Sequence, residues 1–134
     1  MRPDALRDHL LDLVKNAAGV QQVRTLAEAG DTKHPCGLAI NVGGRERRWQ
    51  IMGQLADGEK HDTPTAEVEG QPAAFEPAAV TDSPDAWLAS VLGAAESPHI
   101  ERLDVWSARP DAKPDYFGIT VYYYNGAKSF VRAL

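Results

Sequence analysis

The alternation of hydrophobic and polar residues is clearest at the C-terminal end of the chain. Residues 116–124 form a run of aromatic and β-branched residues, which are the types that favour a pleated, half-buried strand. Asn125-Gly126 follows, and this dipeptide favours a two-residue type I′ turn because both positions accept positive φ. Residues 127–133 then return as a second strand. The pattern predicts a β-hairpin in which Tyr124 pairs with Ala127.

This register divides the hairpin into two faces, because directly paired residues share a face. The predicted core face contains Phe117, Ile119, Val121, Tyr123, Phe130 and Leu134, with Lys128 and Arg132 interspersed. The other face contains Tyr116, Thr120, Tyr122, Tyr124, Ala127, Ser129, Val131 and Ala133. The tyrosines make this second face a candidate binding surface. The alternative is that the central segment of the chain packs against it.

Two helices are predicted from apolar residues that recur every three or four positions. The first, at residues 4–18, is opened by Pro3 and the acidic Asp4, and the second begins at Ser83-Pro84-Asp85 and ends before Pro98. Strands are predicted at residues 20–27, 38–42, 45–52 and 99–108.

Gly43-Gly44 predicts a second tight turn, between the strands at 38–42 and 45–52. With two residues in this turn, the return strand places Arg45 and Arg47 on the same face as Trp49. That face is the apolar one, and the arginines lie near the hairpin tip, where a helix need not cover them.

The halves 1–55 and 83–134 share the order helix, strand, polar loop, strand, tight turn, strand. We expect an α+β fold in which two αβββ halves, related by internal duplication or by convergence, form an antiparallel sheet with two helices packed on one face. Residues 1–134 would then be a single domain. The joining segment, residues 56–82, is rich in proline and acidic residues, which predicts a solvated linker.

Composition narrows the classes of function. The chain has 134 residues, 43% of them hydrophobic, and a formal net charge of −5, which is typical of a folded globular protein and argues against general nucleic-acid binding. The single Cys36 cannot form an internal disulfide, so a cytoplasmic location is expected. No apolar run approaches the roughly 18 residues of a membrane span. Abundant Ala, Gly, Pro, Asp and Arg suggest a bacterial genome of high GC content.

No motif predicts catalysis or metal binding. His34, Cys36 and His61 supply ligand types, but their spacing matches no standard zinc pattern, and Cys36 falls where a small buried residue is common. The basic cluster around Arg47 and Trp49 is divided between two faces by strand alternation. We therefore expect no catalytic residue, cofactor, metal or nucleic-acid partner.

The first functional hypothesis is a non-catalytic protein-binding protein, because exposed aromatic residues anchor interfaces. Its predicted partner-binding face consists of Trp106, Tyr116, Tyr122 and Tyr124. Small acidic α/β proteins of this kind include adaptors, toxin-neutralising immunity proteins and secretion chaperones, and the order of elements is similar to that of the chaperones. The second hypothesis is a small-molecule-binding protein or enzyme with a pocket between the halves, lined by His34, Arg47 and Trp49. A homodimer formed through the aromatic face is the third.

Overall fold

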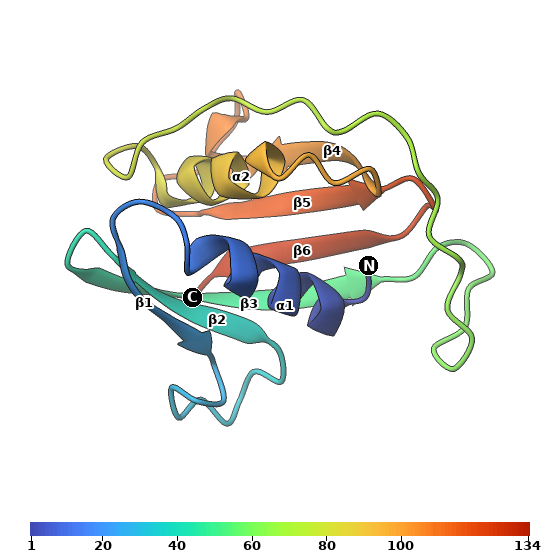
Figure 1. The fold of residues 1–134 in the computed structure, drawn as a ribbon, viewed down its shortest axis with the longest axis horizontal. Coiled ribbons are helices and arrows are strands. Elements are labelled where there is room, and N and C mark those ends of the chain that lie inside the picture. Colours follow the sequence, from blue (N-terminus) through green and yellow to red (C-terminus); the bar gives the residue numbers. More distant parts are fainter.

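Two α-helices lie side by side on one face of a six-stranded antiparallel sheet, and neither helix covers the other face (Figure 1). This computed structural model describes all 134 residues. The elements in chain order are α1 (Pro3–Val14), β1 (Val20–Thr25), β2 (Gly37–Val42), β3 (Arg45–Gln54), α2 (Pro84–Ala94), β4 (Ile100–Val105), the 3-10 turn η1 (Trp106–Ala108), β5 (Gly118–Tyr123) and β6 (Lys128–Ala133). The predicted α+β class is confirmed.

The strand order, β1-β2-β3-β6-β5-β4, keeps the three strands of each half together. β3 and β6 meet at the centre and join the halves. Both edge strands carry an irregularity at the corresponding place, between Val20 and Gln22 in β1 and between Ile100 and Arg102 in β4. The arrangement therefore repeats in the two halves, while an origin by duplication stays a prediction.

Both halves contribute to one hydrophobic core between the helices and the sheet. The cluster contains 18 buried residues, and the apolar stripe of α1 is fully buried in it. Ile51, Val131 and Ile119 form a row across β3, β6 and β5 beneath the helices. Burial of each such side chain stabilises the fold by about 1.5–3 kcal/mol.

The predicted register of the C-terminal hairpin is wrong by one residue. Tyr123, not Tyr124, faces Ala127: its N–H donates to the Ala127 carbonyl at 3.1 Å, and the Gly126 N–H donates back to the Tyr123 carbonyl at 3.0 Å. Only Gly126 has positive φ, 92°, so the loop has three residues and resembles a type I turn with a glycine bulge. The slip turns every β6 side chain to the opposite face.

The β2–β3 hairpin has the predicted two-residue turn. Gly43 and Gly44 have φ of 62° and 78°, values that residues with side chains rarely adopt, and the flanking residues pair directly. Arg47 therefore lies opposite Ile40 on the helix-covered side of the sheet. This confirms the predicted face for Arg47 and Trp49.

The central segment, residues 56–82, contains no helix or named strand, but it contacts the folded halves along its length. Figure 1 shows it passing from the end of β3, beside the β5–β6 turn, and along α2. The Gly70 N–H donates to the Pro98 carbonyl at 2.8 Å, and the Ala78 N–H donates to Ser90 Oγ at 3.1 Å. Phe75 packs on Gly93 of α2, where no side chain blocks it.

Asp85, at the start of α2, is a fully buried charged residue. Its carboxylate accepts hydrogen bonds from the backbone N–H groups of Ser107 and Gly118, at 3.0 and 3.1 Å, and from the Ser107 hydroxyl. The Ala86 N–H also donates to it. One side chain thus ties the first turn of α2 to η1 and to the start of β5.

Replacing Asp85 by asparagine should destabilise the fold markedly. An amide has one acceptor oxygen, so Asp85→Asn leaves buried donors unpaired, and we expect the free energy of unfolding in urea to fall by about 2–4 kcal/mol. The matched variant is Asp82→Asn, because the exposed Asp82 accepts one bond, from the Ala79 N–H, which an amide oxygen can replace. It should lose less than about 1 kcal/mol. Equal losses would contradict this role for Asp85.

Candidate functional site

Trp106 and Tyr116 form an aromatic pair on the helix-free face of the sheet. The Trp106 ring lies against Gly118, where any Cβ would overlap it, and the indole N–H donates to Thr120 Oγ1 at 2.9 Å. The Tyr116 ring stacks on Trp106 with centroids 5.2 Å apart and an interplanar angle of 18°. Trp106 is thus fixed by contacts within the protein, whereas Tyr116 is exposed.

Tyr122 lies on the same face between two cations. Its cross-strand neighbours are Arg102 in β4 and Lys128 in β6. The Arg102 guanidinium lies 3.9 Å from the ring centroid and the Lys128 ammonium 5.2 Å from it, both over the ring. Such cation–π contacts stabilise exposed pairs by about 0.5–1 kcal/mol. Phe130 belongs to the neighbouring row of cross-strand pairs, between Thr120 and Met52.

Tyr124 lies apart from the other predicted face residues, in the β5–β6 loop. Its ring packs over Gly70, and its hydroxyl donates to the Gln71 carbonyl at 2.6 Å. The structure therefore brings Trp106, Tyr116 and Tyr122 together on the open face of the sheet. The central segment contacts Tyr124. The alternative interpretation of the sequence had expected this segment to pack against the whole tyrosine-containing face.

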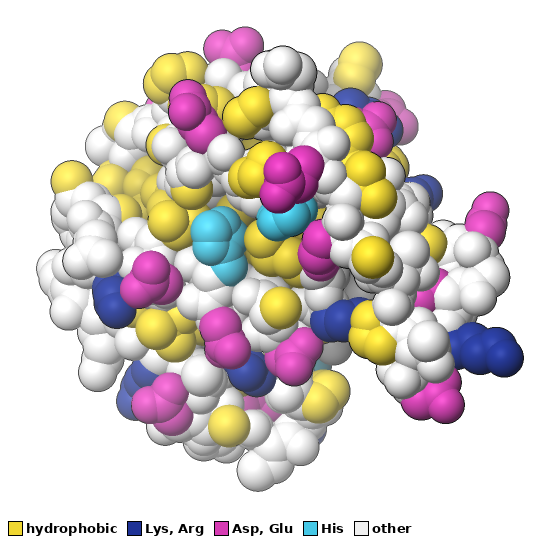
Figure 2. Space-filling model, turned by 45° about the vertical axis from the view of Figure 1, so that its right-hand side comes forward, with side chains coloured by type: hydrophobic (Ala, Val, Ile, Leu, Met, Phe, Trp, Pro, Cys, Tyr) yellow, Lys and Arg dark blue, Asp and Glu magenta, His cyan; other side chains and the backbone are white.

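The open face is cationic although the chain is acidic. Among the residues that have a direct cross-strand partner, five cations and two acids lie on this face: Arg24, Arg48, Arg102, Lys128 and Arg132, with Glu46 and Asp104. These seven groups sum to +3, so the rest of the chain carries −8 to give the total of −5. Figure 2, in which the side carrying the central segment comes forward, shows acidic side chains scattered over that part of the surface.

The cations of the open face fall into two groups, those that form an ion pair with a carboxylate and those that do not. Arg24 and Arg48 share Glu46, at 3.2 and 3.3 Å. Arg102, Lys128 and Arg132 have no carboxylate within 4.0 Å, and Arg132 instead donates to the Gln50 side chain at 3.3 Å. We call the group around these unpaired cations the cationic aromatic face. It consists of Arg102, Tyr122, Lys128, Phe130 and Arg132.

Sequence reasoning missed three members of this face because of the hairpin register. Lys128, Phe130 and Arg132 were predicted to face the core. A signal was present in the sequence, since two cations at alternate positions of one strand conflict with a buried face. Two unpaired charges under a helix would have been costly, and the observed register avoids that cost.

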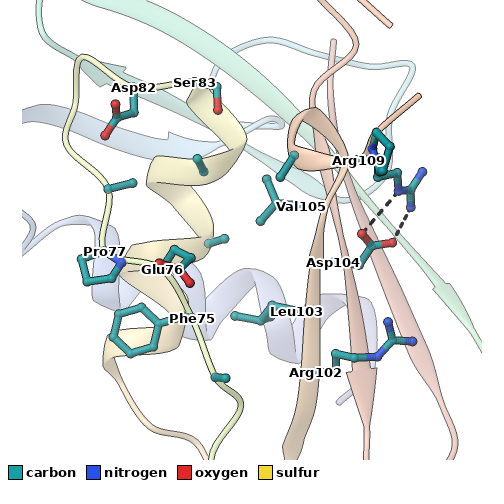
Figure 3. A pocket seen from close by; sticks show the side chains of 16 residues that line it. Phe75, Glu76, Pro77, Asp82, Ser83, Arg102, Leu103, Asp104, Val105 and Arg109 are labelled. Atoms are coloured by element: carbon teal, nitrogen blue, oxygen red, sulfur yellow. Dashed lines mark hydrogen bonds and ion pairs between the residues drawn. The ribbon is translucent and has the colours of Figure 1, made fainter. Parts of the chain in front are cut away.

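A groove of about 730 Å³ lies between β4 and the central segment (Figure 3). Leu103 and Val105 point from β4 toward α2, and Phe75 lies on the other side of the groove. Asp104 and Arg109 form an ion pair at the rim, which raises the pKa of the Arg109 guanidinium. β4 is an edge strand, so this apolar groove adjoins a strand edge that no other segment pairs with.

A second cavity, of about 560 Å³, lies on the helix side between the two halves. Arg47 and Trp49 both line it, so the structure brings these two predicted pocket residues together. His34 does not line it. His34 lies in the β1–β2 loop, at the other end of β2, where its Nδ1 is 2.8 Å from the Asp31 carboxylate.

The remaining reactive side chains are not gathered as metal ligands. No three His, Cys, Asp or Glu residues are clustered so as to hold a metal ion. Cys36 is half-buried, and burial is the main cause that raises the pKa of its thiol, so the nucleophilic thiolate is disfavoured. Neither helix is both long and apolar enough to cross a bilayer.

The Asp31–His34 contact predicts a pH-dependent stability. Hydrogen bonding, chiefly to the His34 side chain and then to backbone N–H groups, lowers the pKa of Asp31 from 3.8 to about 2. A lowered folded-state pKa stabilises the protein above pH 3.8, and that stabilisation is lost as the pH falls toward 2.

Asp31→Asn should therefore melt at a lower temperature than the parent chain at pH 7. The difference should shrink between pH 4 and pH 2, as followed by circular dichroism. Asp57→Asn is the matched control, because Asp57 is exposed and no hydrogen bond or ion pair involves its carboxylate. A difference for Asp31→Asn that is constant with pH would show that the ionised carboxylate does not stabilise the loop.

Comparison of the chain with protein-family models, with curated proteins and with solved structures gave no match. The geometry and charge of its surfaces are therefore the grounds on which a function can be assigned.

Proposed function

We propose that this chain is a non-catalytic binding protein, of the adaptor, immunity or chaperone kind, that docks an acidic partner protein on its cationic aromatic face. One observation carries the proposal: three cations without carboxylate partners surround two aromatic rings on the open side of a net-acidic protein. We place the protein in a bacterial cytoplasm, on the grounds of its composition and its single Cys36.

Charge complementarity favours an acidic polypeptide. Arg102, Lys128 and Arg132 can each pair with a carboxylate of the partner without first breaking an ion pair of this chain. Tyr122 and Phe130 supply apolar contact area between these cations, and aromatic residues and arginine are the types that dominate binding energy at interfaces. Opposite charges also accelerate association and discriminate against basic competitors.

Single-stranded nucleic acid is the other partner that aromatic rings and cations on an open sheet can bind. Base stacking needs accessible ring faces. Arg102 and Lys128 already lie over Tyr122, and Trp106 is held between Gly118 and Tyr116. The negative charge on the rest of the chain would also repel a phosphate backbone. A polypeptide is therefore the better fit.

Self-association through this face is disfavoured by its charge. In a symmetric dimer the same patch meets itself, so Lys128 and Arg132 of one copy would approach the equivalent cations of the other. A homodimer would need a different surface.

The proposal is tested with a synthetic peptide of alternating glutamate and tyrosine. We expect it to shift the NMR signals of Tyr122 and Phe130, and to bind more weakly as salt increases. Lys128→Glu combined with Arg132→Glu should weaken binding at least about tenfold, because two attractions become repulsions.

The matched control is Lys33→Glu combined with Lys60→Glu, which makes the same change of net charge at exposed positions outside the sheet. It should bind like the parent chain, and thermal melts should show that both variants fold. The proposal fails if the control loses as much affinity as the face variant. It also fails if an oligothymidine strand binds more tightly than the acidic peptide.

A further inference from the structure

The cavity between the two halves is built by four separate parts of the chain. The β2–β3 hairpin supplies Arg45 and Arg47, the end of the central segment and the start of α2 supply Val80 and Pro84, and the loop before β5 supplies Phe117. Trp49 and Trp87 form part of its lining. A volume of about 560 Å³ lies within the range of about 300–1,000 Å³ that small-molecule sites span.

Two arginines of β3 line this cavity, the exposed Arg45 and the half-buried Arg47, and Arg47 is the one held against the cavity wall. Its guanidinium lies over the Phe117 ring at 5.3 Å from the centroid, and no carboxylate lies within 4.0 Å of it. Burial, followed by repulsion from Arg45, lowers the pKa of Arg47, while the smaller effects of Asp115 and Asp85 oppose this shift. A partly desolvated guanidinium without a close counter-ion is stabilised when an anion binds beside it.

The two acidic residues that line the cavity do not neutralise Arg47 by direct contact. The Asp82 carboxylate accepts a hydrogen bond from the Ala79 N–H at 2.7 Å, within the central segment. Asp115 is exposed, so water solvates its charge. The half-buried charge that lacks a partner is therefore positive, and it decides the charge of the ligand.

We propose that this cavity binds a small aromatic carboxylate, with its carboxylate at Arg47 and its ring against Trp49, Trp87 and Phe117. The planar guanidinium of arginine matches a carboxylate with two parallel hydrogen bonds, and aromatic side chains favour a flat apolar body. The site lies on the helix side of the sheet and does not depend on the partner-binding face. An aromatic phosphate ester presents related chemistry and is a separate arm of the test.

The probe is benzoate, titrated at millimolar concentrations and followed through the indole N–H signals of the three tryptophans. Trp49 and Trp87 line the cavity, whereas Trp106 lies on the opposite face of the sheet and serves as an internal control. We expect the indole signals of Trp49 and Trp87 to shift and that of Trp106 to remain unchanged. Benzylamine, which has the same ring and the opposite charge, should bind at least about tenfold more weakly than benzoate.

Arg47→Gln should weaken benzoate binding at least about tenfold. Arg47→Lys should retain part of the affinity, because lysine keeps the positive charge but lacks the planar, forked donors of the guanidinium. Arg48→Gln is the matched control, because Arg48 is the next residue of β3 but faces the open side, where it pairs with Glu46. It should bind benzoate like the parent chain. If phenyl phosphate binds more tightly than benzoate, and its binding depends equally on Arg47, the assignment of the ligand to a carboxylate is overturned.

The proposal is overturned if benzylamine binds as well as benzoate, or if benzoate moves none of the cavity signals. It is also overturned if Arg48→Gln weakens binding as much as Arg47→Gln does. The acidic peptide used for the cationic aromatic face should instead affect Tyr122 and Phe130 and leave Trp49 and Trp87 unchanged. The two proposals can therefore fail separately.

Discussion

The buried carboxylate of Asp85 is the contact on which both surfaces of this protein depend. It lies in the first turn of α2, where the helix dipole favours a negative charge, and it accepts the N–H groups of Ser107 and Gly118 at the same time. These two residues flank the loop that joins η1 to β5. By holding both ends of that loop, Asp85 fixes Trp106 against Gly118 on one side of the sheet and Phe117 near Arg47 on the other.

The sheet separates two binding chemistries that the same strands supply. Along β3, Arg47 and Trp49 face the helices and the inter-half cavity, whereas Arg48 and Gln50 face the open side. Alternation therefore lets one strand contribute an unpaired guanidinium to an enclosed site and a paired one to an exposed surface. The charge of the whole chain says little about the open face, because most of the acidic residues lie elsewhere.

The sequence was informative wherever structure is determined locally. Apolar spacing and an N-terminal proline were enough to place both helices, and Gly43-Gly44 identified its turn because two successive residues with positive φ favour glycine. The C-terminal register was not accessible in this way. Phe130 and Val131 are adjacent hydrophobic residues, and either could face the core, so the hydrophobic residues alone leave the register open.

The observed register of the C-terminal hairpin creates specific contacts within the core. Val131 is fully buried between Ile51 and Ile119, and the Tyr123 hydroxyl donates to Ser129 Oγ at 2.9 Å. Only the assembled sheet supplies these neighbours. The cationic aromatic face was missed for the same reason, because that register brings its cations to the surface, and the alternate cations of β6 were the sequence signal that favoured it. Of the three predicted pocket residues, Arg47 and Trp49 line the cavity and His34 does not, and the other walls were missed because they come largely from the central segment, the start of α2 and the loop before β5.

The strand order also has a consequence for how the chain folds. Four of the five strand ladders join strands that follow each other in the sequence, and only the ladder between β3 and β6 joins strands that are distant in the chain. Local pairings close short loops and form quickly, whereas a distant pairing must first overcome the entropy of closing a long loop. Each half can thus assemble its three strands from nearby contacts. The docking of β6 on β3, across the long acidic segment, is the step that turns two small sheets into one protein.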